Sequence, residues 1–330
     1  MIEVEGLVKS YGSTHAVKGV DLHVDAGEIV AFLGPNGAGK TTTIEILEGF
    51  RKATAGSVKV MGQDPASAPA SWRGRLGIVL QESEPIPALT ALETVQMQSN
   101  FYSFEGRTRP DPAELLELVG LGDSTGQRVK KLSGGQKRRL DLASALVGDP
   151  DLIFLDEPTT GFDPTARRES WKMVGALRDL NKTVLLTTHY MDEAEHLADR
   201  IVVINGGLIT ARGTAAELAT AVEAKTTISW TCSPGDLKTL VDSGIGQQLG
   251  STIESTESAG NSVSCRLEVS ETIPDLRMLL TATEEHSIDL DGLQVVDPTL
   301  EDIYLKLVAN PSGNHTSDYV SDDMTEEESK

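Results

Sequence analysis

The sequence predicts an α/β fold for the first two thirds of the chain and a small α+β accessory domain after it. Three short, continuous apolar runs bounded by turns have the character of parallel strands buried on both faces: Ile29–Leu33, Leu152–Leu155 and Val184–Thr187. Helical segments lie between these runs, as expected of a mostly parallel sheet with crossover helices. After about Ala221 the composition shifts towards Ser and Thr, which indicates a second domain.

The ends of the first domain are predicted to be antiparallel. Val4–Lys9 and Val20–Val24 alternate apolar and polar residues, as strands of a half-exposed sheet do. A turn at residues 205–207 with the sequence Asn-Gly-Gly joins Ile201–Ile204 to Leu208–Ala211, which predicts a β-hairpin. We therefore expect a mixed core sheet with an antiparallel β subdomain.

A helical lobe is predicted between the strand that carries Gln81 and the strand at Leu152. Thr90 with Glu93 forms a capping box, and Asp111 before a proline opens a second helix. We expect this lobe at about residues 89–147, within a first domain over residues 1–220.

The accessory domain is expected over residues 221–310. Its predicted strands are Thr226–Cys232, Ser262–Glu268 and Gly292–Val296. Helices are predicted near Pro234–Ser243 and Ile273–Thr283, and a helix over Leu300–Val308 ends the domain. Residues 311–330 are acidic and rich in Ser, Thr and Asn, so we expect a disordered tail.

Composition excludes several classes of function. The formal net charge of -21 argues against non-specific binding of nucleic acid. The longest apolar runs are far shorter than the roughly 20 residues that cross a bilayer, and the N-terminus has no signal-peptide pattern. The 2 cysteines, Cys232 and Cys265, have no metal-ligand spacing, and two free thiols are expected.

The first chemical motif is the sequence GPNGAGKT at residues 34–41, which fits G-x-x-x-x-G-K-[ST] between a predicted strand and a helix. Its glycines allow successive backbone N–H groups to face a phosphate, and the helix N-terminus favours an anion there. Lys40 would reach the β- and γ-phosphates, and the hydroxyl of Thr41 would coordinate Mg²⁺.

The second motif is the pair of carboxylates at the end of the Leu152 strand. Asp156 is placed to hold Mg²⁺, and Glu157 can act as a general base for an attacking water. An acidic pair alone is common on protein surfaces. It gains meaning here because two buried strands would bring it to the same edge of the sheet as the Gly-rich loop.

The third motif is LSGGQ at residues 132–136. Ser133 and Gln136 form a capping box, which by itself predicts only a helix start. Lys137, Arg138 and Arg139 follow in the first turns, where positive charge opposes the helix dipole. We interpret this unfavourable charge as a sign that an anion docks at this helix end.

Three further residues carry weaker signals. His189 ends the third core strand and could reach a γ-phosphate or the attacking water. Tyr11 could stack on a base, and Gln81 has no meaning in isolation.

In this order, the motifs resemble those of the nucleotide-binding subunit of an ATP-binding cassette (ABC) transporter, over roughly residues 1–220. The resemblance implies a P-loop NTPase fold and ATP with Mg²⁺ as ligands. It implies catalytic roles for Glu157, His189 and Lys40, and it places Thr41, Gln81 and Asp156 at the metal. The nucleotide-binding positions that it implies are Tyr11, Gly34, Pro35, Asn36, Gly37, Ala38, Gly39, Lys40, Thr41, Thr42, Gln81, Ser133, Gly134, Gly135, Gln136 and Asp163.

In this family two cassettes pack head to tail, and each ATP lies between the Gly-rich loop of one and the LSGGQ motif of the other. The chain has one set of motifs, so the resemblance implies a second subunit, most simply a second copy of itself. It also implies a separate transmembrane permease and a position at the cytoplasmic face of the membrane. Phe162 departs from the family, where Leu is commoner, and little effect is expected.

The C-terminal stretch at residues 298–307, PTLEDIYLKL, resembles the closing segment of daunorubicin-resistance-type exporter ATPases. It favours export of a drug, a lipid or other hydrophobic compound, or a polysaccharide. The alternatives are an ATPase that acts on nucleic acid or ribosomes and an inactive regulatory cassette. The acidic charge and the single motif set disfavour the first, and the complete set of catalytic residues disfavours the second.

Overall fold

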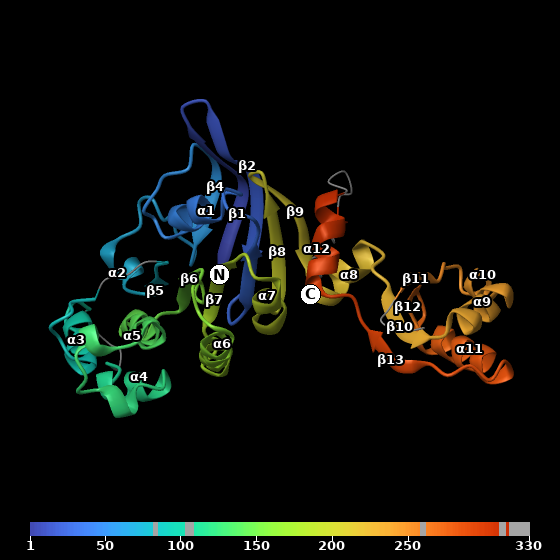
Figure 1. Cartoon of the computed structure of the whole chain (residues 1–330). Coiled ribbons are helices and arrows are strands. Elements are labelled where there is room, and N and C mark those ends of the chain that lie inside the picture. The colour runs from blue at the N-terminus through green and yellow to red at the C-terminus, as the bar shows by residue number, and fades with distance from the viewer. Residues whose placement is uncertain (82–84, 103–108, 258–261, 310–314, 317–330) are drawn as a thin grey trace, which may run out of the picture. The chain divides into compact units, whose positions relative to one another are not determined.

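The computed structural model describes residues 1–81, 85–102, 109–257, 262–309 and 315–316 (Figure 1). The chain divides into two compact units, the first built on Met1–Leu218 and the second on Ala219–Ala309. The sequence-based boundary at residue 220 falls within the helix α8, Ala215–Ala221. Apart from β14, His315–Thr316, the tail expected at residues 311–330 lies outside the described residues.

The first unit is built around a seven-stranded sheet in the order β14-β9-β8-β3-β7-β6-β5. β8, β3, β7, β6 and β5 pair in parallel, and β8 and β9 form the predicted antiparallel hairpin. The predicted core strands are confirmed. The bounds are β3 Ile29–Leu33, β5 Leu76–Val79, β6 Leu152–Asp156, β7 Thr183–Thr188, β8 Arg200–Asn205 and β9 Leu208–Gly213.

An antiparallel sheet in the order β2-β1-β4 packs beside this core. Its strands are β1 Ile2–Tyr11, β2 Thr14–Val24 and β4 Ala55–Val60. The inward side chains of β1 and β2 share one hydrophobic cluster with Phe32 and Phe154 of the parallel strands. That shared core joins the antiparallel sheet to the parallel strands.

Helices connect the strands of the core, as the α/β prediction requires. They are α1 Lys40–Leu47, α2 Ala70–Arg73, α6 Pro164–Asp179 and α7 Met191–Leu197. The predicted helical lobe consists of α3 Ala91–Ser99, α4 Pro112–Leu118 and α5 Gly134–Leu146, with 3₁₀ turns at Gly122–Ser124 and Val129–Lys131. The capping boxes predicted for α3 and α5 are both formed, and Asp111 caps α4.

The second unit contains a four-stranded antiparallel sheet in the order β11-β12-β10-β13. Its strands are β10 Thr226–Cys232, β11 Glu254–Glu257, β12 Val263–Val269 and β13 Asp291–Val296. Its helices are α9 Pro234–Asp242, α10 Ile245–Gln248, α11 Thr272–Glu285 and α12 Leu300–Ala309. The chain order with this strand order is the split β-α-β-β-α-β topology. The sequence patterns indicated an α+β unit but missed β11, which has the polar sequence ESTE and whose residues 254–256 are exposed.

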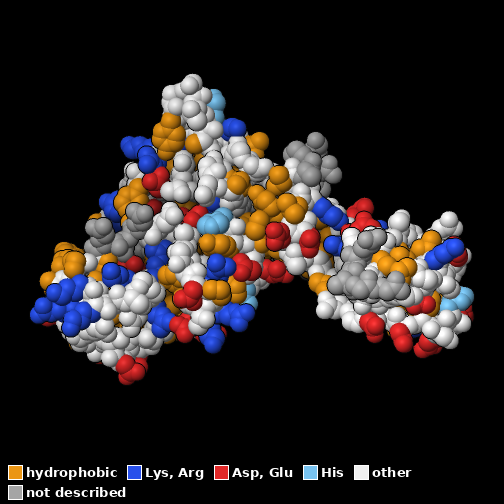
Figure 2. Space-filling view, viewed as in Figure 1, with side chains coloured by type: hydrophobic (Ala, Val, Ile, Leu, Met, Phe, Trp, Pro, Cys, Tyr) orange, Lys and Arg blue, Asp and Glu red, His pale blue; other side chains and the backbone are white. Residues whose placement is uncertain are grey.

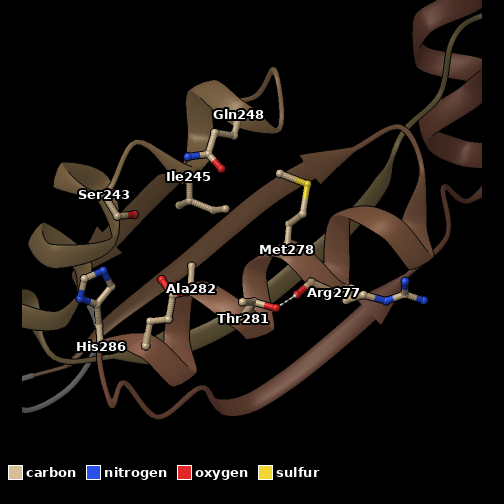
Figure 3. Close-up of a pocket in the computed structure, with 9 residues that line it drawn as sticks. Ser243, Ile245, Gln248, Arg277, Met278, Thr281, Ala282 and His286 are labelled. Carbon is tan, nitrogen blue, oxygen red and sulfur yellow. Dashed lines mark hydrogen bonds between the residues drawn. The ribbon is translucent and has the colours of Figure 1, made fainter.

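A cavity of about 410 Å³ lies within the second unit, between α10 and α11 (Figure 3). Ile245 and Met278 reach toward one another across it, and Ala282 lies beside them. None of the residues expected to bind nucleotide lines this cavity.

Glu48, at the C-terminal end of α1, is a buried acid, with 4% of its surface exposed. Burial raises the pKa of its carboxyl group to about 8, and the nearby charges of Asp156 and Glu45 act in the same direction. The folded chain therefore holds Glu48 protonated near neutral pH, whereas the unfolded chain ionises it above an ordinary pKa of 4.5.

We predict that Glu48→Gln stabilises the chain at alkaline pH. A group whose pKa is raised by folding contributes most below its unfolded pKa and loses that contribution as pH rises through the folded pKa. Relative to the variant, the wild-type free energy of unfolding should fall by about 2 kcal/mol between pH 6 and pH 8 and level off above it. Urea unfolding at a series of pH values measures this, and parallel pH profiles for the two proteins would contradict it.

Candidate active site

The candidate site lies where four neighbouring strands end. β3, β7, β6 and β5 are adjacent and parallel, so their carboxyl ends meet at one edge of the sheet. The loop at residues 34–39 follows β3, and His189 follows β7. Asp156 ends β6, with Glu157 next to it, and Gln81 follows β5. The sheet thereby gathers residues that are more than 150 positions apart in the chain.

The loop after β3 is a tight backbone cradle that requires glycine at two positions. A Cβ on Gly34 would lie 2.3 Å from the carbonyl oxygen of Ile204. Gly39 has φ +107°, and a Cβ there would lie 2.7 Å from the carbonyl oxygen of Ala16. Gly39 is also the N-cap of α1, so the cradle ends at a helix N-terminus, where N–H groups and the helix dipole favour an anion.

Lys40 is the first residue of α1, and its side chain is 5% exposed. Its Nζ donates to the carbonyl oxygens of Gly34 and Pro35 at 2.7 and 3.3 Å. The Oε1 atom of Glu157 lies 3.6 Å from the same nitrogen. Burial lowers the pKa of Lys40, and the carboxylates of Glu157 and Asp156 oppose that shift.

The remaining loop positions differ in exposure. Pro35, Asn36 and Gly37 are exposed at the rim, whereas Ala38 is buried. Thr41 is exposed and Thr42 half-buried in the first turn of α1.

The carboxylate of Glu157 is the centre of the site. Its Oε2 accepts from Nε2 of Gln81 at 3.4 Å and from the hydroxyl of Thr160 at 3.0 Å. The Nδ1 atom of His189 lies 3.3 Å from Oε2 without hydrogen-bond alignment, and it has no other partner in the described part of the chain. Side chains that follow β3, β5 and β7 therefore converge on the carboxylate that follows β6.

Thr187, in β7, was missed by the sequence patterns. Its hydroxyl donates to Oδ1 of Asp156 at 2.5 Å and accepts from the backbone N–H of Glu157 at 3.0 Å. One hydroxyl thus holds both residues that carry the carboxylates. Glu157 has a positive φ of 45°, which is an uncommon backbone conformation for a residue other than glycine. The available signal was a threonine at the C-terminal end of β7, directly after the apolar residues 184–186.

The LSGGQ motif forms the start of α5 in the helical lobe. Ser133 accepts from the N–H of Gln136, and the side chain of Gln136 accepts from the N–H of Ser133. Gly134 is exposed and Gly135 half-buried. Figure 1 shows α5 apart from α1, and no hydrogen bond given for the four residues 133–136 reaches the loop at 34–39.

Positive charge at the start of this helix was interpreted as the sign of a docked anion. For Arg138 and Arg139 this interpretation is wrong. Arg138 donates to main-chain carbonyls at the ends of β5 and β6. Arg139 pairs with Glu169 and donates to the carbonyl oxygen of Gly120. Both side chains therefore have partners inside their own chain and need no docked anion.

Exposed positive charge lies instead just before the motif, on Arg128, Lys130 and Lys131. Figure 2 shows Lys and Arg side chains gathered over the helical lobe. These residues precede the helix rather than occupy it, so the helix-dipole pattern does not single them out.

Tyr11 and Asp163 lie outside the cluster around Glu157. The ring of Tyr11 is 41% exposed at the end of β1, with Nζ of Lys9 5.2 Å from its centroid. Asp163 is the N-cap of α6 and accepts from the N–H groups of Thr165 and Ala166, each at 2.9 Å. This cap gives Asp163 a structural role within its own chain.

The residues at this edge of the sheet fit a nucleoside triphosphate with Mg²⁺. The cradle at residues 34–39 leaves no space for side chains at Gly34 and Gly39, and its buried ammonium faces a carboxylate. Thr41, Gln81 and Asp156 offer oxygen ligands, which Mg²⁺ prefers. The hydroxyl, amide and carboxylate come from three segments that meet at the same sheet edge.

Comparison with known proteins gives a consistent result. Residues 17–160 match the ABC transporter family. A daunorubicin/doxorubicin resistance ATP-binding protein of Streptomyces peucetius is 36% identical over 98% of this chain and 96% of its own length. A linearmycin resistance ATP-binding protein of Bacillus subtilis is 34% identical over 93% of this chain and 98% of its own.

A Nod factor export ATP-binding protein of Burkholderia orbicola is 42% identical over 64% of this chain and 70% of its own length. Among solved structures, a dimeric ATP-binding cassette in a post-hydrolysis state with ADP and Pi has a TM-score of 0.57 and 28% identity. It covers 65% of this chain, and 98% of that cassette is matched.

We predict that Gly39→Ala weakens ATP binding at least tenfold. The new Cβ would meet the carbonyl oxygen of Ala16 at 2.7 Å, and the backbone would have to leave φ +107°. Titration with a fluorescent ATP analogue measures the affinity. Gly175→Ala in α6 is the control, because its Cβ would meet open space, and its affinity should stay within about twofold. Equal affinities for the two variants would contradict the assignment of the cradle.

Proposed function

The chain belongs to the ABC transporter family, and from this premise we propose how its site works and what it drives. It is an ATP-hydrolysing, ATP-binding subunit of the exporter type. The alternative of an ATPase acting on nucleic acid or ribosomes is not favoured, because the relatives are resistance and export proteins.

The observation that carries the proposed mechanism is the convergence of Lys40, Gln81 and His189 on the carboxylate of Glu157. In the proposed role, the loop at residues 34–39 and Lys40 bind the phosphates. Thr41, Asp156 and Gln81 would hold Mg²⁺, which would supply positive charge to the phosphates. Tyr11 stacks on the base with its exposed face.

In the hydrolysis step Glu157 accepts a proton from the attacking water. Its side chain is only 10% exposed, so few water molecules can reach the carboxylate. His189 holds the γ-phosphate or the water through Nδ1, which has no aligned hydrogen-bond partner among the described residues. Lys40 moves from Glu157 to the phosphate, which leaves the carboxylate free to act as a base.

The second half of the site comes from another copy of the chain. Residues 133–136 start α5 with exposed glycine backbone, and Arg128, Lys130 and Lys131 add positive charge beside them. These features suit a phosphate, but the loop at residues 34–39 belongs to a different region of the same chain. A head-to-tail homodimer supplies the missing half, with Asp163 near the shared boundary, and the dimeric relatives support this arrangement.

A separate membrane subunit is the proposed partner. Among the described residues, no helix is long and apolar enough to cross a membrane. A groove of about 390 Å³ lies between β5, α3 and α5, next to Gln81. Its lining includes Met97 and Tyr102 together with Leu80 and Ile86, which are 50% and 46% exposed. A short amphipathic helix of the permease would cover these apolar side chains.

The chain would then act at the cytoplasmic face of the membrane. The resistance and export relatives support a cargo that is a drug, a lipid or other hydrophobic compound, or a polysaccharide. The Streptomyces peucetius resistance protein aligns with 98% of this chain, so the alignment includes the accessory unit.

We predict that Glu157→Gln binds ATP and accumulates as a closed dimer. The amide keeps the size of the side chain but cannot accept the proton, so ATP persists between the subunits. Size exclusion with light scattering in Mg²⁺ and saturating ATP measures the dimer. The matched control is Glu157→Gln with Ser133→Arg, in which an added side chain blocks the α5 terminus and the protein should stay monomeric. A monomer in the first case, or a dimer in both, would count against the two-half-site arrangement.

We predict that Ile86→Glu uncouples transport from hydrolysis. The charge falls in the proposed docking groove but outside the cluster around Glu157, so ATPase activity of the isolated chain should stay within about twofold. Co-purification with the membrane subunit and export should fall at least tenfold. Leu208→Glu, at a similarly exposed position on β9, is the control and should retain both. Loss of export in the control, or full export in Ile86→Glu, would refute the docking groove.

A further inference from the structure

Arg138 has an unusual set of partners for a residue in the first turns of a helix. It lies two positions after Gln136 on α5, in the lobe that carries the LSGGQ motif. Its guanidinium group leaves the lobe and makes its hydrogen bonds with main-chain carbonyl oxygens at the edge of the sheet. These acceptors belong to the two segments that hold Gln81 and Glu157.

The contacts divide between these two segments. After β5, Nη1 donates to the carbonyl oxygen of Leu80 in a very short contact and to that of Gln81 at 3.4 Å. After β6, Nη2 donates to the carbonyl oxygens of Asp156 at 2.8 Å and Glu157 at 3.5 Å. Nε donates to the carbonyl oxygen of Pro158 at 3.2 Å.

A guanidinium group is suited to this task because its donors are fixed in one plane. All three nitrogens are used, and a planar fork holds two backbone segments at a set separation. Burial lowers the pKa of Arg138, and the negative charges of Asp141, Asp156 and Glu193 oppose the shift. The hydrogen bonds and these charges together offset the cost of burying the cation.

We propose that Arg138 is a positioning residue that couples the ATP-binding edge of the sheet to the LSGGQ helix of the same chain. The side chains of Gln81 and Glu157 meet in the proposed nucleotide site, and their backbone carbonyls accept hydrogen bonds from Arg138. A shift of either segment when ATP binds therefore moves α5. This inference rests on the dimer proposed above, in which α5 serves the nucleotide of the partner.

The consequence is communication between the two composite sites. ATP in one site orients the helix that completes the other site, so each bound nucleotide favours closure around the second. Coupling of this kind is reciprocal, because each ligand must change the affinity for the other by the same factor. Arg139, one residue along, makes no such connection, since it pairs with Glu169 and Gly120.

The test compares Arg138→Met with Arg139→Met, each in the full-length Glu157→Gln chain. Methionine keeps much of the length and the apolar stem of arginine but removes every donor. Binding of a fluorescent ATP analogue to the dilute monomer measures the first half-site, and sedimentation in Mg²⁺ and ATP measures closure of the dimer. The parent protein is the Glu157→Gln chain. For Arg138→Met we expect the affinity of the monomer for the ATP analogue to stay within about threefold of the parent, and the dissociation constant of the dimer to rise at least tenfold. For Arg139→Met we expect both values within about threefold.

Closure as tight in Arg138→Met as in the parent would overturn the proposal, and so would an equal loss in Arg139→Met. Should Arg138→Met fail to fold, Arg138→Lys takes its place. A single ammonium keeps the charge but cannot bridge both segments, so closure should weaken at least threefold, and unchanged closure would again overturn the proposal. A parent chain that stays monomeric in ATP would instead refute the proposed dimer, which separates the two failures.

Discussion

The buried charges of Lys40 and Glu157 are the constraint around which the candidate site is organised. Their side chains are 5% and 10% exposed, and the charged atoms lie 3.6 Å apart. Lys40 follows the loop after β3 and Glu157 follows β6, on either side of β7 in the sheet. Removing one partner of a buried pair typically costs about 3–5 kcal/mol, because the remaining charge is left without compensation. The surrounding fold therefore has to keep both charges partnered at each stage of the reaction.

The parallel sheet and its polar edge meet this requirement. The carbonyl oxygens of Gly34 and Pro35 hold the ammonium of Lys40, while Gln81 and Thr160 hold the carboxylate of Glu157. A γ-phosphate entering the cradle offers Lys40 a second anionic partner. In the proposed mechanism, Glu157 is activated when Lys40 exchanges one anionic partner for another, and neither charge is exposed to water.

Local patterns predicted much of this arrangement. The apolar runs gave the buried strands, and the sequence at residues 34–41 gave the loop and the helix start. Capping boxes located the starts of α3 and α5 because both partners lie within four residues of each other. These features share one property, which is that the interactions that create them are local in sequence.

The contacts that escaped prediction are long-range. Thr187 lies 31 positions from Asp156, and Arg138 lies 58 positions from Leu80. No local pattern predicts which carbonyl oxygen a long side chain will reach. The position of Arg138 on the helix therefore did not predict its partners. β11 was missed for a different reason, since it is an edge strand with the polar sequence ESTE, which has no alternation of apolar and polar residues.

The revised partners of Arg138 change the physical account of the LSGGQ helix. A cation in the first turns of a helix opposes the dipole, and an external anion is one way to compensate it. Five carbonyl oxygens of the same chain provide that compensation before any nucleotide arrives. In the proposed dimer, attraction for the partner's phosphate rests on the helix N-terminus and on Arg128, Lys130 and Lys131, which are exposed. In the proposed dimer, Arg128, Lys130 and Lys131 attract the second subunit, whereas Arg138 couples α5 to the nucleotide site of its own chain. A dimer with two linked sites requires both functions.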